Sequence, residues 1–161
     1  MATEMATEVP TAIPQAELTP LSLKPRELSF TLPRALHTTA HIHLNFMNHC
    51  ATVFLATSTP GDSGGSIKPM GSFVYAMPDR TSPKSTISTT LYTSPSSIEY
   101  TTRIAKILAR RLGMPVYVGC SIDPHSLGLE VQEEMEGLTS IVNAVMTNWE
   151  EHKQEKAASE K

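Results

Sequence analysis

The chain has 161 residues, 40% of them apolar and 18% charged, which is enough to bury the core of one domain. Its net charge of -3 gives no reason to expect a polyanion such as nucleic acid as the main ligand. Only two cysteines occur, which argues against a secreted disulfide scaffold. Each lies in or beside an apolar run, so we expect Cys50 and Cys120 to be reduced and buried, with one disulfide as the alternative.

The two ends differ in composition from the middle. Residues 1–26 contain a repeated Met-Ala-Thr-Glu and four prolines, and such a segment cannot bury enough apolar surface to offset its ordering entropy. We expect a disordered extension there, a single domain over residues 27–150, and a flexible tail over residues 151–161. Neither a secretory nor a mitochondrial signal is indicated, and no apolar run is long enough to span a bilayer. We therefore expect no membrane partner and a cytoplasmic address, with the nucleus open by diffusion.

Patterns typical of strands fill the first part of the domain. Residues 28–32 alternate apolar and polar side chains, and residues 40–48 do so more clearly. In the second segment one face carries Ile42, Leu44 and Phe46, and the other carries His41, His43 and Asn45. Residues 51–57 are nearly all apolar, which predicts a central strand. The Asn48-His49 step before them predicts a tight hairpin, because Asn tolerates a positive φ.

Two more strands follow a loop. Residues 59–71 contain four glycines and two prolines, which indicates a loop. Residues 72–77 form the next predicted strand, which Pro78 ends. Residues 85–92 are rich in residues that favour strands but are mostly polar, so we expect this strand at an edge or an interface of the sheet.

The hydrophobic period then becomes helical. Apolar residues at helical spacing predict a helix over 98–112, with an N-terminal cap among residues 94–97 and Gly113 as its C-terminal stop. Residues 116–122 form a further strand. A last helix is predicted over 131–149, with early glutamates that match the helix dipole. Its predicted apolar stripe consists of Val131, Met135, Leu138, Val142, Val145 or Met146, and Trp149.

The order of these elements predicts an α+β fold. Five strands, a helix, a strand and a helix favour an antiparallel sheet of about six strands with two main helices packed on one face. Residues 127–132 fit either the start of the last helix or a short strand before it. The second face of the sheet is then open to water or to a partner. The polar positions expected on it are His41, His43, Thr86 and Thr90.

One short string suggests an alternative function. Residues 61–65 (GDSGG) match the sequence around the nucleophile of chymotrypsin-like proteases, and His41 lies upstream. A small serine hydrolase would use Ser63 with a nearby histidine. Such a nucleophile needs a base oriented by a third group and an oxyanion hole, and the only acid between His41 and Ser63 is Asp62. We therefore interpret the string as a surface loop and expect no enzyme activity.

Two other patterns could indicate binding sites, one for a metal and one for an acidic partner. His41 and His43 place two imidazoles on one strand face, about 7 Å apart at Cα, a spacing that can suit a metal. Zinc needs at least three ligands, and no spaced Cys or Asp set accompanies them, so we expect no metal and no cofactor. Arg103, Lys106 and Arg110 fall at i, i+3 and i+7 of the predicted helix and share one face. This stripe is either a solvated face or a contact for an acidic partner.

The order of segments resembles the proteasome assembly chaperone 4 family. The resemblance covers roughly residues 28–140 and depends on short strings in a shared order. These strings are His43-Leu-Asn-Phe-Met, Ala51-Thr-Val-Phe-Leu-Ala, Ser72-Phe-Val-Tyr-Ala-Met-Pro, the strand of residues 85–91, Ile104-Ala-Lys-Ile-Leu-Ala-Arg-Arg-Leu, Pro115-Val-Tyr-Val and Val131-Gln-Glu-Glu-Met-Glu. The chain departs from the family in a longer N-terminal extension, in the loop at 59–71 and in a longer last helix.

This resemblance implies a function carried out by binding alone. It implies a heterodimer with a homologue of proteasome assembly chaperone 3, which binds alpha-type subunits, notably alpha-type subunit five, while the alpha ring of the 20S core particle forms. No nucleotide, metal or nucleic acid is used. On this basis we expect Arg103, Lys106 and Arg110 to face an acidic alpha-subunit surface. His41 and His43 are expected to face the partner chaperone.

Overall fold

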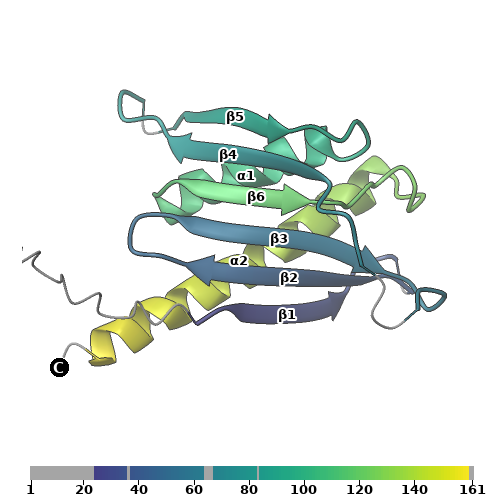
Figure 1. The fold of residues 1–161 in the computed structure, drawn as a ribbon, viewed down its shortest axis with the longest axis horizontal. Coiled ribbons are helices and arrows are strands. Elements are labelled where there is room, and N and C mark those ends of the chain that lie inside the picture. Colours follow the sequence, from purple (N-terminus) through teal and green to yellow (C-terminus); the bar gives the residue numbers. More distant parts are fainter. Residues whose placement is uncertain (1–23, 36, 64–66, 83, 160–161) are drawn as a thin grey trace, which may run out of the picture.

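The computed structural model describes residues 24–35, 37–63, 67–82 and 84–159. Six strands form one mixed sheet in the order β1-β2-β3-β6-β4-β5, and two helices cover one of its faces (Figure 1). The predicted α+β class is confirmed. The predicted disordered extension lies outside the described residues up to residue 23. The elements are β1 (Arg26–Thr31), β2 (Thr39–Phe46), β3 (Ala51–Ser58), β4 (Ser72–Pro78), β5 (Thr86–Tyr92), α1 (Ile98–Leu112), β6 (Val116–Cys120) and α2 (Val131–Ser159).

The sheet is mostly antiparallel, but one pair of strands runs parallel. β6 lies between β3 and β4, parallel to the first and antiparallel to the second. The hairpin order read from the sequence would place β3 beside β4. The connection formed by residues 59–71 is long enough for β4 to lie one strand position away from β3. β6, which follows α1 in the chain, occupies the position between them. The prediction that β3 is central and β5 is at an edge is confirmed.

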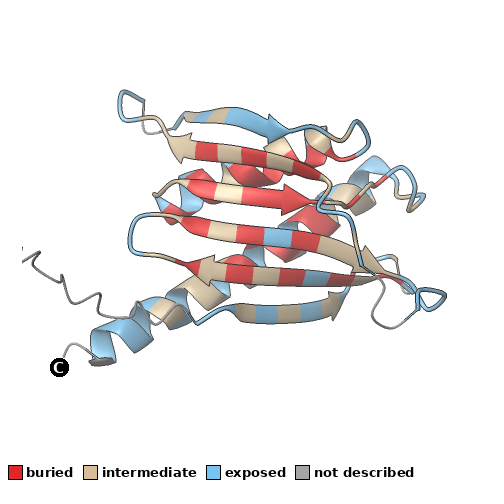
Figure 2. Ribbon diagram, viewed as in Figure 1, coloured by how far each residue is buried: buried red, intermediate tan, exposed pale blue. Residues whose placement is uncertain are grey.

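The core lies between the sheet and the helices. Alternate residues of the central strands point toward the helices and are buried, as the bands of Figure 2 show. α1 packs on β4, β5 and β6, and α2 packs on β2 and α1. The largest fully buried side chains include Ile42, Leu44, Ile104, Leu108 and Ile141. Among the described residues, no helix has both the length and the apolar run needed to cross a membrane.

The ends of α1 agree only in part with the sequence. Gly113 stops the helix as predicted, at φ 68°, and its N–H donates to the carbonyl of Ala109 at 3.1 Å. At the other end, Ser97 occupies the N-cap position but makes no side-chain cap. Its hydroxyl instead accepts a hydrogen bond from the backbone N–H of Ser72 at 3.0 Å, so it joins α1 to β4.

α2 begins where the sequence predicts it, and it ends later than predicted. Residues 124–128 form turns and the helix begins at Val131, so residues 127–132 contain no strand. Val131 is 79% exposed and Met135 is also exposed, although Arg103 of α1 reaches Glu134 and Met135 in the first turns. Of the predicted stripe, Leu138, Val142 and Val145 are buried, and Ile141, which was not assigned to the stripe, is buried with them.

The segment expected to be a flexible tail continues α2 as helix to Ser159. Its Ala, Glu and Lys residues are good helix formers. It is also held from the other end of the chain, because Arg26 forms ion pairs with Glu151 at 3.1 Å and with Glu155 at 2.5 Å.

The hairpin between β2 and β3 also differs in detail. The backbone N–H of Met47 donates to the carbonyl of Cys50 at 2.9 Å, so residues 47–50 form the connection. Asn48 does not adopt the positive φ expected for it. Within the described residues, Arg34 is the only residue other than glycine at positive φ.

Candidate protein-binding surface

The face of the sheet opposite the helices, called here the outer face, carries a row of aromatic side chains. The row runs from β2 across β3 to β4 and β6. Its ring centroids are 6.4 Å apart between His43 and Phe54, and 6.1 Å apart between Phe54 and Phe73. Tyr117 then lies 6.2 Å from Phe73 and 4.9 Å from Tyr75. No described helix or loop covers the whole row, and Phe54 is 37% exposed.

The sequence pattern predicted polar side chains on the outer face and gave no prediction of this aromatic row. The register explains part of the difference, because Thr86 pairs with Pro78 and Thr90 with buried Val74, which places both threonines on the helix side. The signal was present in strands 51–57 and 72–77, which are apolar at both parities. A strand with two apolar faces has either helices on both sides or an open apolar face.

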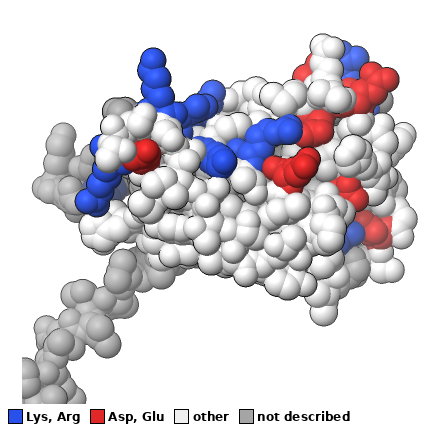
Figure 3. All heavy atoms as spheres, turned by 90° about the horizontal axis from the view of Figure 1, so that it is seen from above, with Lys and Arg blue, Asp and Glu red and all other residues white. Residues whose placement is uncertain are grey.

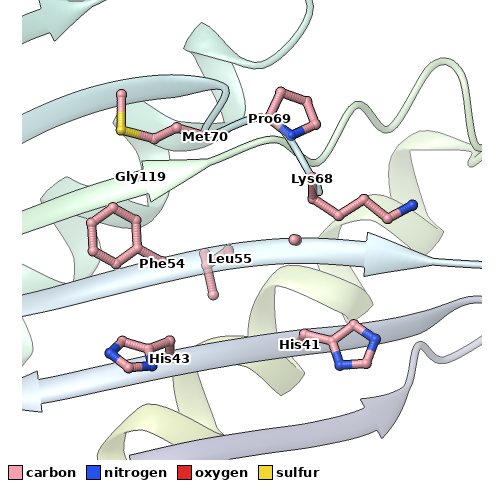
Figure 4. A pocket seen from close by; sticks show the side chains of 9 residues that line it. His41, His43, Phe54, Leu55, Lys68, Pro69, Met70 and Gly119 are labelled. Carbon is pink, nitrogen blue, oxygen red and sulfur yellow. The ribbon is translucent and has the colours of Figure 1, made fainter. Parts of the chain in front are cut away.

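A pocket interrupts the outer face beside this row (Figure 4). His41 and His43 of β2 line one side of it, and Lys68, Pro69 and Met70 of the loop before β4 line the other. The pocket has a volume of about 370 Å³. Small residues keep it open, because Ala56 and Gly119 lie where larger side chains would fill it. A Cβ atom on Gly119 would come within 2.6 Å of the Phe54 ring.

The two predicted histidines both lie on the outer face, as expected from the alternation along β2. The Nε2 atom of His41 lies 2.7 Å from the hydroxyl of Ser58. The Nδ1 atom of His43 lies 3.6 Å from a carboxylate oxygen of Glu27. In the part of the chain that is described, no group of three or more His, Cys, Asp or Glu residues could hold a metal ion. The contacts of His41 with Ser58 and of His43 with Glu27 are those of surface residues beside an apolar face.

The predicted basic stripe lies on the opposite side of the molecule. Arg103, Lys106 and Arg110 are all exposed on α1. Arg103 forms an ion pair with Glu134 of α2 at 2.6 Å, so this end of the stripe is partly neutralised. In Figure 3 charged side chains of both signs gather along the helix layer, basic ones toward the left and acidic ones toward the right, and a broad uncharged area lies below them. The structure therefore separates the two sets of predicted contact residues onto two faces.

The serine of the protease-like string lies in an exposed loop next to residues 64–66, which are outside the described part of the chain. Asp62 is engaged elsewhere, since its carboxylate accepts from the Thr59 N–H at 2.8 Å and contacts the Lys68 ammonium at 2.5 Å. The hydrogen bond from Lys68, followed by that from Thr59, lowers the pKa of Asp62. Among the described residues, no histidine forms a hydrogen bond with Ser63.

The two cysteines are free thiols, and they differ in environment. Cys120 is fully buried in β6, and burial raises the pKa of its thiol to about 12. Cys50 is half-buried rather than buried, and its sulfur lies 4.0 Å from that of Met47.

Comparisons with known proteins agree with this architecture. The family model described as proteasome assembly chaperone 4 matches residues 39–122, which is more than half of the chain. A search of curated proteins gave no match. Among solved structures, a chain from the crystal structure of a novel chaperone complex for yeast 20S proteasome assembly has a TM-score of 0.55 and 17% sequence identity. The alignment covers 76% of this chain and 96% of the yeast chain. At this identity the likeness shows the fold alone.

Proposed function

The chain belongs to the proteasome assembly chaperone 4 family, and from this premise we propose that it promotes assembly of the alpha ring of the 20S core particle. It acts as a heterodimer with a chaperone 3 homologue and binds alpha-type subunits, notably alpha-type subunit five. Membership of the family supports the coarser role of a proteasome assembly chaperone, which is not an enzyme class. We also propose that the protein works in the cytoplasm and can enter the nucleus.

The outer face supports the heterodimer part of this proposal. An uncovered row of aromatic side chains costs free energy in water, and aromatic residues dominate the energetics of protein interfaces. The pocket between His41 and Met70 offers a recess in which a partner side chain can anchor. His41 and His43 lie at the rim of this surface, where polar groups commonly surround an apolar centre. This open aromatic face is the observation that carries the proposal.

The basic stripe supports binding of an alpha-type subunit on the other side. Lys106 and Arg110 project from α1 away from the sheet, so they stay accessible when the outer face is occupied. Exposed basic groups steer an acidic partner and suppress wrong partners more than they add affinity. With two separate faces, one molecule can hold the partner chaperone and a ring subunit together, which raises the local concentration of correct neighbours.

Co-expression with the chaperone 3 homologue tests the heterodimer. Gel filtration should give one peak that contains both chains in equal amounts. Two separate peaks would contradict the proposal.

Charge reversal tests the alpha-subunit contact. The double variant Lys106→Glu and Arg110→Glu should weaken pull-down of alpha-type subunit five while the heterodimer still forms, because both side chains are exposed on the helix side. The control is Lys153→Glu, an exposed position near the far end of α2. Unchanged pull-down by the double variant would remove the stripe from the interface.

A further inference from the structure

The open edge of β5 carries neither charge nor proline, two features that often protect the edge of a sheet. Its seven residues, Thr-Ile-Ser-Thr-Thr-Leu-Tyr, include no charge and no proline. Ile87, Leu91 and Tyr92 are 49%, 52% and 59% exposed, so apolar side chains accompany the free backbone. β5 pairs with β4 on one side, and no described strand pairs with it on the other. From Thr86 to Thr90 β5 keeps a regular register with β4, and the register shifts only at the Tyr92 end. An exposed edge of this kind is a template for another strand.

The opposite edge of the same sheet is protected. β1 contains Arg26 and Glu27, and Pro25 precedes it. Arg26 is also tied to two glutamates of α2, so a charged network lies along this edge. Charges and prolines are the devices that natural sheets use against unwanted pairing. The two edge strands therefore differ in charge, because β1 carries charged residues and β5 carries none.

We propose that β5 binds an extended segment of the alpha-type subunit as a seventh strand. This inference rests on the proposed function. Where this segment pairs with β5, its side chains on the helix side are acidic and those on the outer-face side are uncharged. Main-chain hydrogen bonds supply affinity in this mode, and alternate side chains supply specificity.

The charge distribution next to the edge identifies the chemistry of this partner. α1 packs over β5 on the helix side of the sheet, and Lys106 and Arg110 are exposed along its C-terminal half, with Glu99 on the same face in its first turn. Arg111 is turned the other way and donates to the side-chain oxygen of Asn143 on α2. Figure 3 looks onto the β5 edge, where charged groups of both signs lie along the helix layer above an uncharged surface, with the basic ones toward the left and the acidic ones toward the right. A strand added there has one side under these cations. Acidic residues on that side are therefore favoured.

The same charges argue against a second copy of this chain as the occupant. Antiparallel pairing of two β5 strands about a twofold axis would build one continuous sheet with both α1 helices on the same face. The two basic stripes would then approach each other, which opposes association. A partner that supplies negative charge has no such cost.

Amide hydrogen exchange of the heterodimer, followed by NMR with and without alpha-type subunit five, tests the proposal. Alternate N–H groups of an edge strand point to its open side. Bound alpha-subunit should slow exchange at alternate residues of β5, and these amides should stay fast in the heterodimer alone. Amides that stay fast in the ternary complex, or are already slow in the heterodimer, would overturn the proposal. If the heterodimer binds no alpha-type subunit, the proposed function falls as well.

A matched pair of variants gives a second test. Thr89 and Ser29 are exposed hydroxyl residues in the middle of the two edge strands, and their register partners Tyr75 and His41 place both on the outer face. Thr89→Lys should weaken binding of the alpha-type subunit by about tenfold, and Ser29→Lys should leave it unchanged. Both variants should fold with normal melting temperatures, and alpha-subunit binding is measured at concentrations at which each variant is fully paired with the chaperone 3 homologue. Equal effects of the two variants on alpha-subunit binding, or loss of the heterodimer with Thr89→Lys alone, would overturn the assignment.

Discussion

Gly71 shows how one residue fixes the path into β4. It has φ +70°, and a Cβ atom there would lie 2.0 Å from the carbonyl oxygen of Cys120. Gly71→Ala should therefore lower the free energy of unfolding by more than the roughly 1–2 kcal/mol that the left-handed conformation alone costs. Gly113 supplies the control, because it has φ +68° with no atom within 4 Å. Urea denaturation of both alanine variants measures the difference, and equal losses would contradict the close contact.

Ser97 makes a second prediction at the same scale. Its buried hydroxyl accepts from the Ser72 N–H and lies 3.0 Å from the Ser72 hydroxyl, which donates to the carbonyl of Ser94 at 3.0 Å. Ser97→Ala leaves the buried Ser72 N–H without this acceptor, whereas the Ser72 hydroxyl keeps its hydrogen bonds to the backbone of Ser94. The variant should therefore cost about 1–3 kcal/mol in unfolding free energy. Ser96→Ala, at an exposed neighbour, should cost almost nothing. Equal stability of the two variants would show that a water replaces the lost hydroxyl.

At the scale of elements, periodicity is sufficient to locate all six strands and both helices along the chain. It is not sufficient to find the neighbours of β6 within the sheet, because local alternation carries no information about which strand lies beside which. The length of the 59–71 loop was the available clue. The end of α2 was missed for a similar reason, since the ion pairs that Arg26 makes with it join residues far apart in sequence. The separation of His41 and His43 from the basic stripe followed correctly from placing both helices on one face. The aromatic row was missed because each strand was read for one buried face only.

The end of α2 should respond to pH through His152. Its ring packs against Phe46 and Trp149, with centroids 5.3 and 5.8 Å away. Burial, followed by the positive charge of Arg26, lowers the pKa of His152 below its ordinary value of 6.5, although Glu155 opposes this shift. The folded state therefore binds protons less readily than the unfolded state. Its stabilisation is complete above pH 6.5 and is lost as the pH falls from there through the lower pKa of the folded state.

NMR titration of the His152 ring checks this directly, and unfolding at pH 7.5 and 5.5 checks the linkage. His152→Phe keeps the aromatic packing and removes the proton, so stability should fall less between the two pH values than in the unsubstituted chain. An unaltered pH dependence in this variant would contradict the assignment.

At the scale of the whole molecule, the open outer face ties stability to the partner. A ligand that binds only the folded state stabilises it by about 2.7 kcal/mol at a hundredfold excess over Kd. For a chain of this size that corresponds to a rise in Tm of roughly 5–10 °C. Thermal unfolding with increasing amounts of the chaperone 3 homologue should show this rise.

Two variants assign the rise in Tm to one face. Phe54→Lys places a charge within the aromatic row at a position that reaches water, so it should abolish most of the rise because a desolvated charge opposes binding. Lys106→Glu, on the helix side, should retain it. If Lys106→Glu removed the rise and Phe54→Lys did not, the partner chaperone would bind the helix layer, and the aromatic face would need a different occupant.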